Sequence, residues 1–232
     1  MPTVVAFTGL ACGTLLAAAG LAPWDELQQA PGLSKAVRGI RWMAGGLLLT
    51  GAVLAWQGDQ DISTPTLRLT LMAIWAAPPA IHRRPCPPWG SALSILPALA
   101  LAGAGLFLTP SPTENGASGL AAALVRLAVV TCGGLGARAL AQGLGQLTTS
   151  IPRFRRPSAT AHVLLTLLAA STGIVNLWQR GAMWGGNADE RGLAGAWLAW
   201  SAARLSPRQP PWLPTVLTAV ATLLLVVVAV GC

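Results

Sequence analysis

Long apolar segments, separated by short links rich in Pro, Gly and charge, recur along the whole 232-residue chain. A membrane hydrocarbon layer is about 30 Å thick, and about 20 residues of helix cross it. Hydrophobic residues make up 53% of the sequence and charged residues only 9%, too few to cover a soluble globule. We therefore predict an all-α, polytopic integral membrane helical bundle that forms a single transmembrane domain over residues 1–232.

Eight of these segments are predicted to be transmembrane helices. They cover about residues 3–21, 40–56, 67–81, 89–108, 119–147, 159–178, 192–205 and 214–230. No basic stretch precedes the first segment, so we expect a retained span rather than a signal peptide. Small residues recur every fourth position in the fifth segment, at Gly133, Ala137, Ala141 and Gly145, and predict a face for close helix packing.

The distribution of charge predicts an orientation. If the links alternate between sides, one side holds ten basic residues: Lys35, Arg38, Arg41, Arg83, Arg84, Arg153, Arg155, Arg156, Arg204 and Arg208. The other side holds three basic residues and five of the seven acids. The positive-inside rule then places both termini outside. The expected location is a bacterial inner membrane or a thylakoid membrane. Topology and anionic lipids account for the net charge of +8, so lipids and not nucleic acid are the expected partners.

Two histidines and one arginine are candidate binding residues. His82 follows the third apolar segment and His162 opens the sixth, and a neutral imidazole at either place could ligate haem iron. An interfacial residue in a basic link is the alternative for both. Arg126 lies about 10 Å below the predicted outer surface, where an unpaired cation is costly. It is expected to bind a carboxylate or propionate, to snorkel outward, or to bond backbone carbonyls.

An outer loop rich in Trp and Gly links the sixth and seventh segments. It runs from Trp178 to Glu190 and also contains Trp184, Gly185, Gly186, Asn187 and Asp189. A belt of Trp at the membrane interface explains this composition without any ligand. Aromatic faces beside a flexible loop would also suit a flat macrocycle.

The order of these features resembles the CcsA/ResC branch of the cytochrome c assembly proteins, over about residues 39–230, with residues 1–38 forming a first span and basic loop outside that region. The matching features are Gly173-Ile174, Trp178, Trp184-Gly185, Glu190, Trp197-Leu198, Arg208, the span with Trp75, and His82. The resemblance implies a haem-handling protein in which His82 ligates the metal. Trp178 and Trp184 would then form a platform for the macrocycle, and Arg126 would bind a propionate. The family's outer histidines are absent from this sequence.

Two classes of function follow. The first assists haem delivery or assembly of a membrane cytochrome complex, together with partner membrane proteins of the assembly pathway. The second is a non-catalytic structural or assembly subunit of a larger respiratory or photosynthetic membrane complex. Because the family's signature loop is incomplete here, catalysis is not the favoured interpretation. A transporter is a weaker third option, since the sequence shows no inverted repeat.

Overall fold

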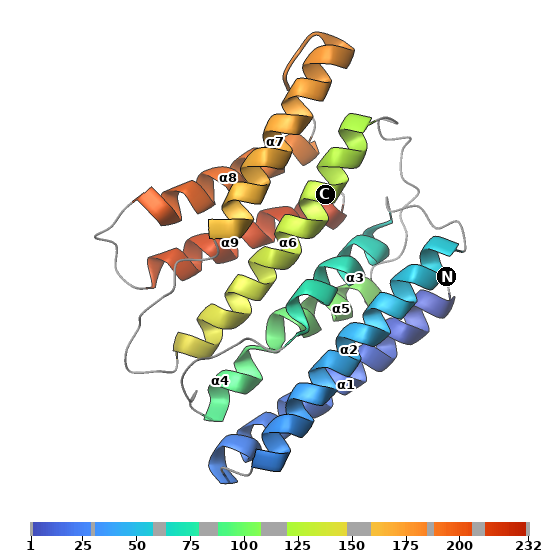
Figure 1. Cartoon of the computed structure of the whole chain (residues 1–232), viewed down its shortest axis with the longest axis vertical. Coiled ribbons are helices and arrows are strands. Elements are labelled where there is room, and N and C mark those ends of the chain that lie inside the picture. Colours follow the sequence, from blue (N-terminus) through green and yellow to red (C-terminus); the bar gives the residue numbers. More distant parts are fainter. Residues whose placement is uncertain are drawn as a thin grey trace.

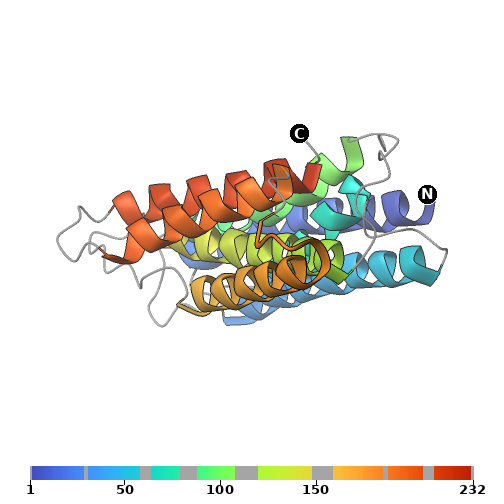
Figure 2. The same cartoon turned by 90° about the horizontal axis from the view of Figure 1, so that it is seen from above.

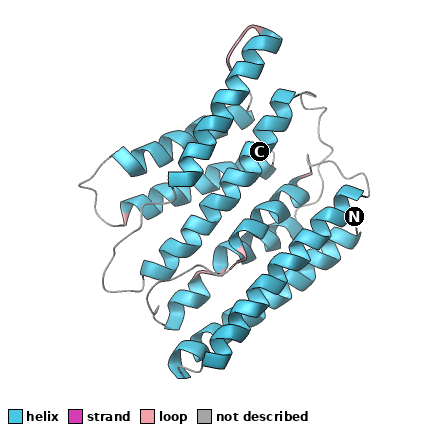
Figure 3. Ribbon diagram, in the orientation of Figure 1, coloured by secondary structure: helices cyan, strands magenta, loops and turns pink. Residues whose placement is uncertain are grey.

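The structure, a computed structural model, describes residues 2–28, 31–57, 64–78, 88–107, 120–147, 159–184, 188–205 and 212–230. Almost all of these residues are helical, and none of them forms a strand (Figure 3). The helices are α1 (Pro2–Gln28), α2 (Pro31–Gln57), α3 (Pro65–Ala76), α4 (Pro88–Leu93), α5 (Leu96–Phe107), α6 (Leu120–Leu147), α7 (Ala159–Arg180), α8 (Ala188–Leu205) and α9 (Leu213–Val230). The prediction of an all-α protein is confirmed.

The chain runs back and forth between the two ends of the bundle (Figure 1). The pairs α1–α2 and α8–α9 are antiparallel and closely packed, and α6 lies between them with α3, α5, α7 and α9 around it. Seen from above, the long helices run along roughly the same direction (Figure 2), whereas Figure 1 shows α8 and α9 lying across α6. The largest hydrophobic cluster draws side chains from every helix except α4, so the other helices share one core.

Each of the eight predicted segments coincides with a helix, and the fourth coincides with two, α4 and α5. Their boundary is at Ser94 and Ile95, where the Ile95 N–H donates to the Ala92 carbonyl in a tighter turn. Pro97 follows, and because proline has no N–H, the Leu93 carbonyl has no intrahelical donor. The break between α4 and α5 therefore follows from the position of Pro97 in the sequence.

The prediction was wrong about the link between the first two segments. A polar connection was expected over residues 22–39, but α1 continues through Pro23 to Gln28 and α2 already begins at Pro31. Proline is well tolerated in the first turn of a helix, where its missing N–H would have no partner. The first two helices consequently extend well beyond their apolar parts.

Five of the helices contain a stretch long and apolar enough to cross a membrane: Val5–Pro23, Leu33–Gln57, Ala122–Leu144, His162–Gln179 and Leu213–Val230. Helices α3 and α5 have 12 residues each, or about 18 Å, which is less than a hydrocarbon layer. Helix α8 is longer but carries Asp189, Glu190, Arg191 and Arg204. The architecture is that of a helical, multi-pass membrane protein in which half-length helices pack among long ones.

Candidate functional site

The most buried cation with a described environment is Arg41 on α2, whose side chain is 4% exposed. Its Nε donates to the Ala77 carbonyl at 3.1 Å and its Nη2 to the Pro78 carbonyl at 3.1 Å. Its Nη1 donates to Ser94 Oγ at 2.8 Å, and its Nη2 also approaches the Ser94 carbonyl at 3.5 Å. One guanidinium thus joins α2 to the end of α3 and to the break between α4 and α5.

These acceptors exist because two helices end inside the bundle. The last carbonyls of a helix have no intrahelical donor. Pro78 closes α3, and the turn at Ser94 closes α4. Where water is absent, a free carbonyl is costly unless a side chain satisfies it. Arg41 supplies several donors in a fixed planar arrangement, which suits a group of neighbouring carbonyls.

A second polar cluster joins α7 to α8 around His162. Arg204 Nη1 lies 3.1 Å from His162 Nδ1, and Ser201 Oγ lies 2.8 Å from His162 Nε2. Arginine can only donate, so Nδ1 must accept, and the neutral ring donates from Nε2 to the Ser201 hydroxyl. The ring also stacks on Trp197, with centroids 5.9 Å apart. The Trp197 indole donates in turn to Thr166 Oγ1 at 2.9 Å.

Both nitrogens of His162 are therefore occupied by partners on α8. A ring in this state has no free lone pair for a metal ion, and ligation of haem iron would require the Arg204 or the Ser201 contact to break. The structure gives His162 a role in joining two helices. It places the other candidate ligand, His82, outside the described residues.

Two further buried polar contacts lie toward the opposite end of the bundle. Asn176 on α7 donates from Nδ2 to Glu190 Oε1 on α8 at 2.8 Å, and both side chains are buried. Arg68 on α3 is also buried and donates to the Val228 carbonyl near the end of α9 at 3.4 Å. Each contact again connects two helices.

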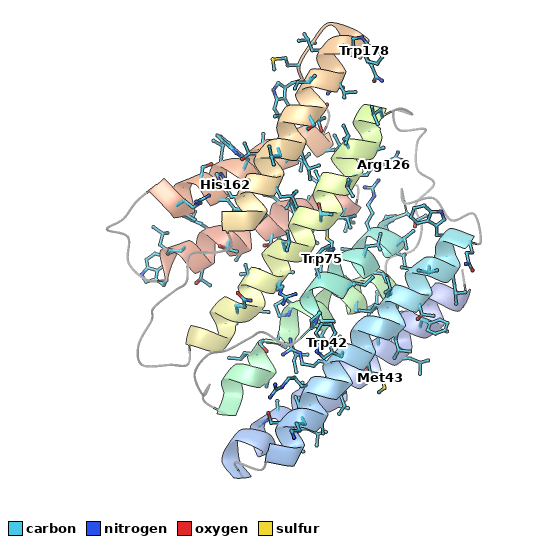
Figure 4. All side chains as sticks on the ribbon, in the orientation of Figure 1. Trp42, Met43, Trp75, Arg126, His162 and Trp178 are labelled. Carbon is cyan, nitrogen blue, oxygen red and sulfur yellow. The ribbon has the colours of Figure 1, made fainter. Side chains whose placement is uncertain are left out.

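The predicted aromatic and cationic groups do not converge. Trp178 is 83% exposed at the end of α7 and Trp184 is 48% exposed just beyond it. Trp178 follows His162 by 16 residues of continuous helix, or about 24 Å. Arg126 is half-buried on α6 and already interacts with another group. Figure 4 shows Arg126, His162 and Trp178 at three separate places in the bundle.

The predicted small-residue face of α6 is indeed a packing surface. Ala137 and Ala141 are buried, and Gly133 packs against Met72 of α3. The neighbouring Gly134, which the predicted face did not include, packs against Trp75 of α3. Gly145 belongs to α6, but its surroundings lie outside what the structure describes. This face lets α3 approach α6 closely.

Searches of protein-family models, of curated proteins and of solved structures find no match for this chain. The resemblance to the cytochrome c assembly proteins therefore stays a hypothesis. Within the described ranges, no three His, Cys, Asp or Glu side chains are grouped as a metal site would need.

Sequence reasoning missed the partners of Arg41, Asn176 and His162. Arg41 was assigned to a cytoplasmic link, yet its side chain is enclosed by helices. A signal was present in Pro78, Ser94 and Pro97, which interrupt apolar segments and leave carbonyls needing a donor. Nothing in the sequence identifies which basic residue supplies it.

Proposed function

We propose that this chain is a non-catalytic structural or assembly subunit of a larger membrane complex. The observation that carries the proposal is the use made of the buried polar side chains. Arg41, His162 and Asn176 each donate to or accept from groups on other helices, and each contact links two or three helices. These side chains use their hydrogen-bonding groups to hold the helices together, which is the role of a structural subunit.

The outer face of α7 supports the same role. This helix packs against α6 and α8, and its opposite side exposes Val163, Leu167, Ile174 and Leu177. In Figure 1, the end of α7 that precedes Trp184 extends past the neighbouring helices. In a subunit of a larger complex, a helix of a partner protein would pack on this apolar face within the membrane.

The proposed orientation has eight membrane crossings with both termini outside, in a bacterial inner membrane or a thylakoid membrane. The half-length α3, the α4–α5 pair and the charged α8 would complete the crossings made by the five long apolar helices. Lys35 and Arg38 are exposed at the end of the bundle opposite the two termini, as the positive-inside rule requires of a cytoplasmic end. Reporter domains fused to the C-terminus and inserted at residues 29–30 should give opposite locations.

Haem handling is the second candidate function, and the exposed Trp178 and Trp184 favour it. Their indole faces are available near the end of α7, in the order that the cytochrome c assembly proteins would use to present a macrocycle. In this case haem would be the cofactor, His82 the metal ligand and Arg126 a propionate partner.

One purification separates the two functions. The tagged chain is extracted in mild detergent and analysed by native electrophoresis and by absorption spectroscopy, oxidised and dithionite-reduced. A discrete assembly larger than the monomer, without a Soret band, is the result expected for a structural subunit. A monomer with near-stoichiometric haem that His82→Ala removes would overturn that proposal and establish haem handling, with His162→Ala as the matched histidine control.

A further inference from the structure

A second arginine lies close to the Arg41 cluster. Arg138 is on α6, one helical turn beyond Gly134, which packs against Trp75 of α3. Helix α3 runs in the same direction as α6, and the Ala77 and Pro78 carbonyls that bind Arg41 directly follow its last residue. The two guanidinium groups are near enough to repel each other. Arg138 is half-buried and lies six residues, or about 9 Å of helix, before the end of the span Ala122–Leu144.

Among the side chains that the structure describes, none neutralises this pair. Arg41 donates its Nε and Nη2 hydrogens to carbonyls and one Nη1 hydrogen to Ser94. One Nη1 N–H of Arg41 therefore has no hydrogen-bond acceptor among the described residues. No described acceptor bonds Arg138. Asp25 and Glu26 belong to α1, but their side chains lie outside what the structure describes. The described acidic side chains are on α8, where Glu190 precedes Trp200, which packs at Gly136, by ten residues or about 15 Å of helix.

Two cations close together in a low-dielectric bundle are unfavourable unless an anion joins them. Guanidinium groups match the geometry of phosphate oxygens and bind them through several hydrogen bonds. We propose that Arg138, together with the remaining Nη1 N–H of Arg41, binds one phosphate group at the basic end of the bundle. The inference does not depend on which of the two proposed functions is correct.

The phosphate could belong to an anionic phospholipid or to a free phosphate compound. Exposed aromatic side chains flank the region: Trp42 is 60% exposed on α2 and Trp75 is 42% exposed on α3 (Figure 4). Indole rings suit the boundary between headgroups and acyl chains. Exposed Arg38, farther along the same end of α2, would also attract anionic headgroups.

The test uses full-length protein purified in dodecyl maltoside and native mass spectrometry. Dioleoyl phosphatidylglycerol is titrated against dioleoyl phosphatidylcholine, and inorganic phosphate is titrated in a separate arm. Four proteins are compared: the unaltered chain, Arg138→Gln, Arg138→Lys, and the matched control Lys35→Gln, which removes an exposed charge from the same end. Circular dichroism and gel filtration verify that each variant folds.

We expect one phosphatidylglycerol to bind in preference to phosphatidylcholine. Arg138→Gln should weaken that binding by about tenfold or more, the equivalent of about 1.4 kcal/mol. Arg138→Lys should lie between, and Lys35→Gln should remain within about twofold of the unaltered chain. Saturable binding of inorganic phosphate that depends on Arg138, without lipid selectivity, would assign the site to a free phosphate compound. Equal losses in Arg138→Gln and Lys35→Gln, or no binding in either arm, would overturn the proposal.

Discussion

Replacing Gly134 by alanine tests the close approach of α3 and α6. A Cβ atom at this position would lie 2.6 Å from Trp75 Cδ1 and 2.8 Å from both Trp75 Cβ and Cγ. Carbon atoms pack best at about 3.5–4.0 Å, so the helices would have to separate by about 1 Å. Trp75 Cβ is fixed to the α3 backbone, so rotation of the indole cannot relieve the clash.

The expected magnitude comes from two opposing effects. Overpacking a well-packed core costs about 1–3 kcal/mol. Alanine is also a better helix former than glycine by about 1 kcal/mol, which partly offsets that cost. Gly46→Ala provides the matched control, because a Cβ at Gly46 of α2 meets no atom within 4 Å. The propensity gain is common to both variants, so Gly134→Ala should be about 1–3 kcal/mol less stable than Gly46→Ala.

The measurement is the free energy of unfolding in mixed micelles, with sodium dodecyl sulfate as denaturant and circular dichroism as the probe. Both variants are compared with the unaltered chain. If Gly134→Ala proves as stable as Gly46→Ala, the two helices do not meet at Gly134, and the argument from close packing fails.

Three other substitutions probe the polar contacts with the same unfolding assay. Arg41→Gln should lower stability by about 2–3 kcal/mol, because buried carbonyls lose their donors; exposed Arg38→Gln should have little effect, and equal losses would contradict the cluster. His162→Phe retains a ring to stack on Trp197 but loses both hydrogen bonds, at a cost of about 1–2 kcal/mol; unchanged stability would refute the α7–α8 link. Asn176→Leu leaves Glu190 without its amide donor and should cost about 1–2 kcal/mol, a loss that Asn176→Gln should partly restore if the geometry is right.

The positions of the helices were largely predictable from the sequence. The apolar segments predicted over 119–147 and 214–230 agree closely with α6 and α9, because Pro, Gly and charge bound them on both sides. The ends of α1 and α2 were not predictable in this way, since their polar turns look like a link. An apolar composition predicts only the part of a helix that lies in the hydrocarbon layer. The helix itself can continue past that part into the headgroup layer.

The candidate site was less predictable. The exposure of Trp178 agrees with an interfacial belt, a pattern that needs no tertiary information. The partners of His162 lie 39 and 42 residues further along the chain, and only the packing of α7 on α8 brings them together. The partners of Arg41 are harder still to predict, because most of its acceptors are backbone carbonyls, which every residue possesses. Sequence shows where a carbonyl loses its donor, but the fold decides which cation reaches it.

The half-length helices explain why such cations are needed. Helices α3 and α5 each span only about 18 Å, so at least one end of each falls within the thickness of the bundle. Non-helical backbone at that depth is stable only when protein encloses it and satisfies its polar groups. The long helices α1, α2 and α6 provide the enclosure, and Arg41 satisfies the carbonyls where α3 and α4 end. The Arg41 guanidinium that satisfies these carbonyls is also the cation that, together with Arg138, is proposed to bind an anion.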